Sequence, residues 1–135
     1  MNPAAEAILS QPFTAVVAVN RPAGGPQVTP VWFLWDGTAF YFNTTRERTK
    51  YNNILRDPSI SLLVHDSKGY GFVAAYGQAQ TIQNSDPTFA DLTTRIVSRY
   101  VSLEQVDHFV QPSLAANHVI IKVVPDKIVA PGGDA

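Results

Sequence analysis

The chain has 135 residues, of which 45% are hydrophobic and 16% charged, so it is too apolar to be disordered and suits one folded domain over residues 1–135. Its net charge of −1 argues against nonspecific binding to DNA, RNA or anionic membranes. The absence of cysteine excludes disulfides, iron–sulfur clusters and a thiol nucleophile. No export signal or spanning apolar run is recognisable, so we expect a cytoplasmic protein.

The first part of the chain is dominated by short, β-branched apolar runs. Asp36-Gly37 is typical of a hairpin turn between two such runs. The expected elements are a helix over 3–11 and strands over 13–19, 27–35 and 38–43, and we expect the three strands to form an antiparallel meander.

A second helix is expected directly after these strands. Thr44-Thr45-Arg46-Glu47 fits the S/T-x-x-E capping box, which predicts Thr44 as the N-cap and Glu47 as the third helical residue. The helix would end near Asp57-Pro58, because a residue before proline avoids the helical conformation.

The remaining elements continue the same pattern of strands with helices between some of them. The pattern predicts strands over 60–64, 70–82, 117–124 and 127–129, a helix opening at Asp86-Pro87 and a short helix near 102–104. Most links are too short for repeated βαβ crossovers, so a mainly β fold, a small antiparallel barrel with peripheral helices, is expected.

Several familiar catalytic patterns are missing. Gly69-Tyr70-Gly71-Phe72-Val73-Ala74 matches G-x-G-x-x-A, but a strand follows it where a dinucleotide site requires a helix. The three histidines have no metal-ligand spacing, and no G-x-S-x-G motif occurs. We therefore expect no metal site and no hydrolase centre.

Cations are concentrated on the predicted second helix, which carries four of the ten Lys and Arg residues. Arg46, Lys50 and Asn53 would share one face, close to the free N–H groups and the Thr44 and Thr45 hydroxyls at the helix start. Such a group suits a phosphate, although a solvated helix face with a routine cap would have the same composition.

Pro30 interrupts an otherwise regular strand. A proline removes one ladder hydrogen bond and is confined to edge strands or bulges. The backbone at Thr29, Val31 and Trp32 could then bind a planar heterocycle with polar edges, or the proline could simply protect a sheet edge from aggregation.

Five segments carry a family signature through their order and spacing. They are Pro26-Gln27-Val28-Thr29-Pro30-Val31-Trp32-Phe33, Asp36-Gly37, Phe40-Tyr41-Phe42-Asn43, Arg48-Thr49-Lys50-Tyr51-Asn52-Asn53 and Arg56-Asp57-Pro58. Together they resemble the pyridoxamine 5′-phosphate oxidase-like split β-barrel superfamily, and within it the F420-dependent flavin/deazaflavin oxidoreductases of the B group. The similarity covers about 13–82 and resumes over 117–129.

The resemblance implies an FMN-binding-like split β-barrel that forms a homodimer, with a cofactor in each cleft between the subunits. The 29–32 strand would line the deazaflavin ring, the region from Asn43 to Lys50 would bind the phosphate, and Tyr70 and Phe72 would reach the site of the partner subunit. The candidate cofactor-binding residues are Gln27, Thr29, Pro30, Val31, Trp32, Asn43, Thr44, Thr45, Arg46, Arg48, Thr49, Lys50, Tyr70 and Phe72.

The activity implied is that of an F420H2-dependent reductase that passes a hydride to a small conjugated or hydrophobic acceptor: a quinone, an enone or a tetrapyrrole such as biliverdin. No catalytic side chain is expected, because the hydride comes from the cofactor. The S-R-K sequence that opens the matching helix of pyridoxamine phosphate oxidases is absent, which disfavours FMN. An FMN-dependent oxidoreductase of the pyridoxamine phosphate oxidase type and a non-catalytic flavin- or haem-binding protein remain the alternatives. Residues 84–116 resemble the family least and are expected to hold acceptor-specific walls.

Overall fold

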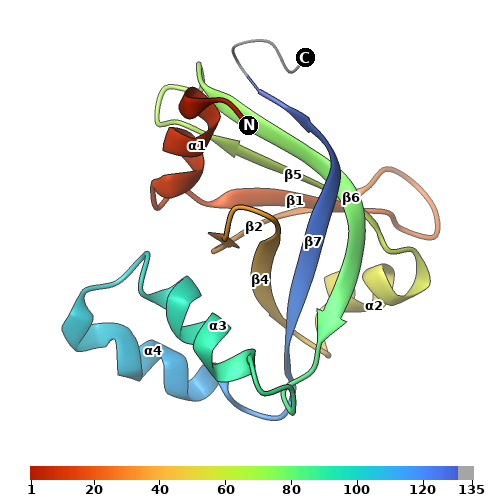
Figure 1. The fold of residues 1–135 in the computed structure, drawn as a ribbon. Coiled ribbons are helices and arrows are strands. Elements are labelled where there is room, and N and C mark those ends of the chain that lie inside the picture. The colour runs from red at the N-terminus through yellow and green to blue at the C-terminus, as the bar shows by residue number, and fades with distance from the viewer. Residues whose placement is uncertain (131–135) are drawn as a thin grey trace.

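The fold is mainly β, as predicted. The computed structural model describes residues 1–130, in which seven strands form one curled antiparallel sheet in the order β2-β1-β5-β6-β7-β4-β3 (Figure 1). The strands are β1 (Ala15–Val19), β2 (Gln27–Val31), β3 (Leu34–Trp35), β4 (Phe40–Thr45), β5 (Ser59–His65), β6 (Phe72–Ile82) and β7 (His118–Val129). The helices are α1 (Pro3–Ser10), α2 (Thr49–Arg56), α3 (Phe89–Val97), α4 (Val106–Ser113) and the short 3-10 helix η1 (Leu103–Gln105). No helix within 1–130 is long and apolar enough to cross a membrane.

The main core fills the concave side of the sheet. Alternate residues of each strand point inward, so Phe40 and Phe42 of β4 are buried there while Tyr41 and Asn43 point to the opposite face. Helix α1 packs against β5 and β6 and adds Leu9 to this core.

A second, smaller core lies on the outer face of β4 and β7. Phe89, Leu92 and Ile96 follow one stripe of α3 and pack against Tyr41 and Ile120. This packing confirms the helix predicted after Asp86-Pro87. It places α3, and α4 beside it, over the end of the sheet at which β4 finishes (Figure 1).

The predicted effect of Pro30 on its strand is confirmed. β2 is an edge of the sheet and pairs only with β1, with Pro30 opposite Val16. The missing N–H of the proline therefore costs no ladder hydrogen bond to a second neighbour.

The predicted meander is wrong. The 27–35 run divides into β2 and β3, which lie at opposite edges of the sheet, so the chain crosses the open side of the curled sheet at Trp32 and Phe33. At the crossing the Phe33 backbone pairs with side chains: its N–H donates to Tyr100 Oη at 3.0 Å, and its carbonyl accepts from the Arg99 guanidinium. Long-range side-chain partners thus replace the hydrogen bonds that a meander would have supplied.

The predicted capping box is also wrong. Thr44 and Thr45 continue β4, where they pair with Val119 and His118, and α2 begins only at Thr49 with Arg48 as its N-cap. Glu47 instead accepts a hydrogen bond from Asn117 Nδ2 at 3.1 Å. Pairing with β7 extends the strand through the predicted cap. Arg46 consequently lies in a turn and shares no helical face with Lys50.

The two predicted closing strands are one strand, β7, which pairs with β6 on one side and with β4 on the other. The register of β6 against β7 shifts between Tyr76 and Gly77. A Cβ atom at Gly77 would lie 2.8 Å from the Val124 carbonyl oxygen, so the bend requires glycine.

Gly77→Ala is expected to destabilise the protein by about 1–3 kcal/mol, because backbone atoms of β7 would have to move away from the new methyl group. Gly25→Ala is the matched control, since a Cβ at position 25 meets no atom within 4 Å. Urea unfolding of both variants measures the difference. Equal midpoints would contradict the close contact.

Candidate cofactor site

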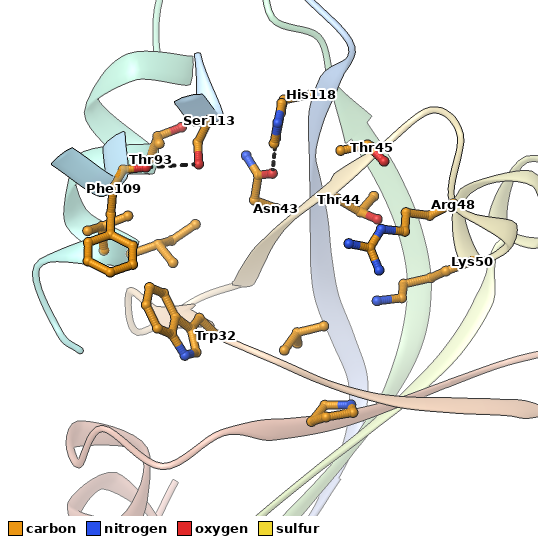
Figure 2. Close-up of a pocket in the computed structure, with 14 residues that line it drawn as sticks. Trp32, Asn43, Thr44, Thr45, Arg48, Lys50, Thr93, Phe109, Ser113 and His118 are labelled. Carbon is orange, nitrogen blue, oxygen red and sulfur yellow. Dashed lines mark hydrogen bonds between the residues drawn. The ribbon is translucent and has the colours of Figure 1, made fainter. Parts of the chain in front are cut away.

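A cavity of about 300 Å³ lies between the β2 edge, the end of β4, the start of α2 and the helices α3 and α4 (Figure 2). Its lining combines cations at one end, an amide and an imidazole in the middle and aromatic side chains at the other end. The lining residues are Pro30, Val31, Trp32, Asn43, Thr44, Thr45, Arg48, Lys50, Thr93, Ile96, Val97, Phe109, Ser113 and His118.

Lys50 is the most unusual charge in the site. Only 8% of its surface is exposed, and among the described residues it has no hydrogen-bond acceptor and no acidic partner. Its Nζ lies 5.9 Å from the centre of the Phe42 ring. Burial, together with the nearby positive charge of Arg48, lowers the pKa of the Lys50 ammonium. A buried cation without a counter-ion is expensive, so the site favours an anionic ligand.

Helix α2 holds this cation in place. Tyr51 and Ile54 anchor the helix in the main core, and Asn53 Nδ2 donates to Gln27 Oε1 of the β2 edge strand at 3.1 Å. Arg48 makes no side-chain capping bond, and its guanidinium points toward the cavity beside Lys50 (Figure 2). The free N–H groups of the first helical turn add partial positive charge at the same end.

Aromatic side chains form the opposite wall. Trp32 stacks on Tyr100 with ring centres 4.8 Å apart and planes 7° apart, and the Phe109 ring lies 5.9 Å from Trp32. Tyr100 Oη donates to the Phe13 carbonyl at 2.9 Å, which fixes the ring beneath Trp32. This end of the cavity suits a flat, apolar group.

Asn43 and His118 occupy the middle of the cavity wall. Asn43 Oδ1 lies 2.7 Å from His118 Nδ1, and Asn43 Nδ2 is buried with no partner among the described residues. Burial lowers the pKa of His118, the Arg48 charge adds to this effect, and the Glu47 carboxylate opposes it. The lowered pKa favours the neutral form of His118.

The structure brings together most of the predicted residues. Pro30, Val31, Trp32, Asn43, Thr44, Thr45, Arg48 and Lys50 all line the cavity. Gln27, Thr29 and Thr49 flank it without lining it, and Gln27 instead binds α2. Arg46 points elsewhere, since its guanidinium donates to the Ala116 carbonyl and to Gln83 Oε1.

Tyr70 and Phe72 do not reach this cavity within one chain. Tyr70 is 84% exposed, and Phe72 lines a separate, shallow cavity with Leu63, His65 and Gly69. Their expected contact with a cofactor would have to be made in the site of a second chain.

Six lining residues were not singled out from the sequence: Thr93, Ile96, Val97, Phe109, Ser113 and His118. Five of them belong to α3 and α4, inside the 84–116 segment expected to carry acceptor-specific walls. No local motif marks them, because their position depends on how α3 packs on the outer face of the sheet. No group of three or more His, Asp or Glu side chains within 1–130 could hold a metal ion.

A curled antiparallel sheet with four helices defines a split β-barrel of the FMN-binding-like type, and here a cavity with two cations lies beside the interrupted edge strand. The family model described as "Pyridoxamine 5'-phosphate oxidase" matches residues 1–130, and the chain belongs to this family. The family includes oxidoreductases, and its fold binds flavin-type cofactors. No curated protein matches the chain in sequence.

Solved structures agree with this assignment. One described as an F420 reductase is 30% identical, with a TM-score of 0.77 over 96% of this chain and 98% of that chain. A conserved hypothetical protein from Mycobacterium tuberculosis is 23% identical, with a TM-score of 0.78 over 96% and 84% of the two chains. HutZ, a heme storage protein from Vibrio cholerae, shares the fold at 12% identity, with a TM-score of 0.74 over 93% and 90%.

Proposed function

We propose that the protein is an F420H2-dependent reductase that transfers a hydride from the deazaflavin to a small conjugated or hydrophobic acceptor. The observation that carries the proposal is the buried, unpartnered Lys50 at the start of α2, next to a cavity with an aromatic wall. A phosphorylated ring cofactor fits both parts, since its phosphate supplies the missing counter-ion and its ring suits the flat end. The 30% identity to a structure described as an F420 reductase favours the deazaflavin over FMN.

The residues of this chain would bind the cofactor, orient its ring and shield it from water. Lys50 and Arg48 hold the phosphate through charge-assisted hydrogen bonds, with the Thr44 and Thr45 hydroxyls alongside. The edge strand at Pro30 and Val31 supports the ring, and Trp32 helps to exclude water. A bound, reduced deazaflavin supplies the hydride, so the protein contributes chiefly proximity and orientation.

A homodimer is part of this proposal. The outer face of β5 and β6 carries exposed apolar side chains in one chain: Leu63 is 38% exposed and Tyr76 is 45% exposed, and Tyr70 and Phe72 lie at its end. A second copy seated on this face would cover these side chains and could bring Tyr70 and Phe72 to the neighbouring cavity.

Light scattering on the purified protein is expected to give twice the mass of the chain, and a monomer at micromolar concentration would contradict this part of the proposal.

Titration with F420 and with FMN, with Trp fluorescence as the signal, tests the cofactor assignment. We expect tight binding of F420 and at least tenfold weaker binding of FMN. Steady-state assays with F420H2 and a panel of quinones, enones and biliverdin then test turnover. Tight binding of FMN alone would overturn the deazaflavin assignment, and F420 binding without oxidation by any acceptor would favour a non-catalytic binder.

A further inference from the structure

The Asn43–His118 pair has a geometry that fixes its hydrogen-bonding chemistry. Asn43 lies on β4 and His118 at the start of β7, and both face the outer side of the sheet. In the register, His118 is directly opposite Thr45, which is two residues from Asn43 on the same face. The two side chains are therefore diagonal neighbours, within reach of one another. Their contact is 2.7 Å long and joins His118 Nδ1 to Asn43 Oδ1.

An amide oxygen only accepts hydrogen bonds, so His118 Nδ1 must carry the proton in this contact. The amide orientation and the imidazole tautomer are thus coupled. With Oδ1 engaged, Asn43 Nδ2 is on the far side and turns toward the α3–α4 side of the cavity (Figure 2). Its two N–H groups are buried there without a partner among the described residues.

A buried donor without an acceptor is unfavourable, so a ligand that supplies the acceptor binds more tightly. The other groups nearby on this wall leave the donor free. Thr93 Oγ1 donates to the Phe89 carbonyl at 2.8 Å, and Ser113 Oγ donates to the Phe109 carbonyl at 3.2 Å. Both hydroxyl protons thus point to the helix backbone, and neither hydroxyl oxygen accepts a hydrogen bond from Asn43 Nδ2.

We propose that His118 is a positioning residue that presents Asn43 Nδ2 as a hydrogen-bond donor to a conjugated carbonyl oxygen of the bound ligand. The aromatic wall formed by Trp32 and Phe109 accommodates the conjugated system, and the amide binds its oxygen. Such an oxygen occurs on the ring of a deazaflavin and on an enone or quinone acceptor. The inference rests on the proposed function only in naming the deazaflavin ring and the acceptor as the two molecules that could supply this oxygen.

The imidazole tautomer is the first test, and it requires no variant and no ligand. ¹⁵N NMR of the ¹⁵N-histidine-labelled protein at pH 8 is expected to show His118 as the Nδ1–H tautomer. The Nε2–H tautomer would make Nδ1 an acceptor, reverse the amide and point Oδ1 into the cavity. That result would overturn the proposal, because the site would then select a ligand donor.

The second test compares two matched probes on the cofactor-free protein: menadione, which has conjugated carbonyls, and 2-methylnaphthalene, which has none. We expect Asn43→Leu and His118→Leu to weaken menadione binding by about tenfold and to leave 2-methylnaphthalene binding unchanged. His118→Asn keeps an N–H near the position of Nδ1 and is expected to restore menadione binding. Unfolding midpoints confirm that each variant is folded.

F420 titrations of the same variants separate the two sources of the oxygen. A loss of F420 affinity in Asn43→Leu and His118→Leu, with recovery in His118→Asn, assigns the donor to the cofactor ring, whereas a loss confined to menadione assigns it to the acceptor. If Asn43→Leu and His118→Leu bind both F420 and menadione as tightly as the wild type does, the proposal is overturned. If the wild-type protein fails to bind F420, the proposed function fails, while the tautomer and the menadione comparison still decide the role of His118.

Discussion

Replacing Lys50 by methionine is expected to weaken F420 binding by about 10- to 100-fold and, at the same time, to stabilise the ligand-free protein by roughly 1–2 kcal/mol. The two effects have opposite signs because they have one cause. Burial of the ammonium without an acidic partner destabilises the empty protein, and the phosphate of the proposed cofactor would provide the compensating charge. Methionine has a similar length and no charge. It therefore removes the free-energy cost of the buried charge and also the cation that would bind the phosphate.

Isothermal titration with F420 and urea unfolding of the free protein measure the two effects. Lys127→Met, on an exposed part of β7, is the matched control and is expected to change neither. Arg48→Met removes an exposed cation from the same site and is expected to weaken binding without a gain in stability. A Lys50→Met variant that binds F420 like the wild type would show that the phosphate lies elsewhere.

The same variant should alter the pH dependence of stability. The pKa of folded Lys50 is lowered below its ordinary value of 10.5, so between the two values the unfolded chain binds the proton more tightly than the folded one. The contribution of Lys50 to stability therefore increases as the pH rises through the interval below 10.5. Lys50→Met is expected to lack this increase, and parallel stability curves for the two proteins between pH 8 and 10 would contradict it.

Arg99→Met is expected to cost about 2–4 kcal/mol of folding stability, the largest loss from any single polar side chain that we predict. The guanidinium donates to the carbonyl groups of Leu9 at 2.9 Å and Gln11 at 2.7 Å, and to that of Phe33. It also lies over the Phe33 ring at 4.4 Å. One side chain thus joins the end of α1 to the crossing between β2 and β3. Methionine would leave the Leu9 and Gln11 carbonyl groups without this donor, and the Phe33 carbonyl would keep only Tyr100 Oη at 3.2 Å.

Tyr100→Phe is the matched comparison, since it deletes only the hydroxyl that accepts from Phe33 N–H and donates to the Phe13 carbonyl. It keeps the ring that stacks on Trp32 and is expected to cost about 1–2 kcal/mol. Thermal and urea unfolding rank the two variants. An Arg99→Met protein as stable as the wild type would mean that water replaces the guanidinium at all three carbonyl groups.

Local chemistry was sufficient to predict some elements of the fold. The edge position of β2 followed from the missing N–H of Pro30, and the turn at Asp36-Gly37 is fixed by Asp36 Oδ1, which accepts from the N–H groups of Thr38 and Ala39 at 2.9 and 2.8 Å. In both cases a property of one or two residues decides the structure. The resemblance to the family then gave the split β-barrel fold and the location of the candidate site.

Long-range pairing explains the two errors. Thr44 could cap a helix as well as extend a strand, and β7, about 75 residues further along the chain, decides in favour of the strand. Likewise, nothing within residues 27–45 specifies that β2 and β3 belong to opposite edges of the sheet, since the deciding contacts come from Arg99 and Tyr100. The site was predicted where it uses β2, β4 and α2. For α3 and α4 only the 84–116 segment as a whole was expected to contribute, and its individual lining residues and His118 were missed, because their roles depend on tertiary packing.

The position of β7 between β4 and β6 has a consequence for biosynthesis. β7 is the last of the seven strands to leave the ribosome, yet it supplies the hydrogen bonds on one side of β4 and brings His118 to Asn43. Until β7 has emerged, one edge of β4 is unpaired and the cavity lacks the part of its wall that His118 forms. Ligand capture must therefore follow translation of the chain as far as β7, and the protein should depend on slow, non-local assembly for its maturation.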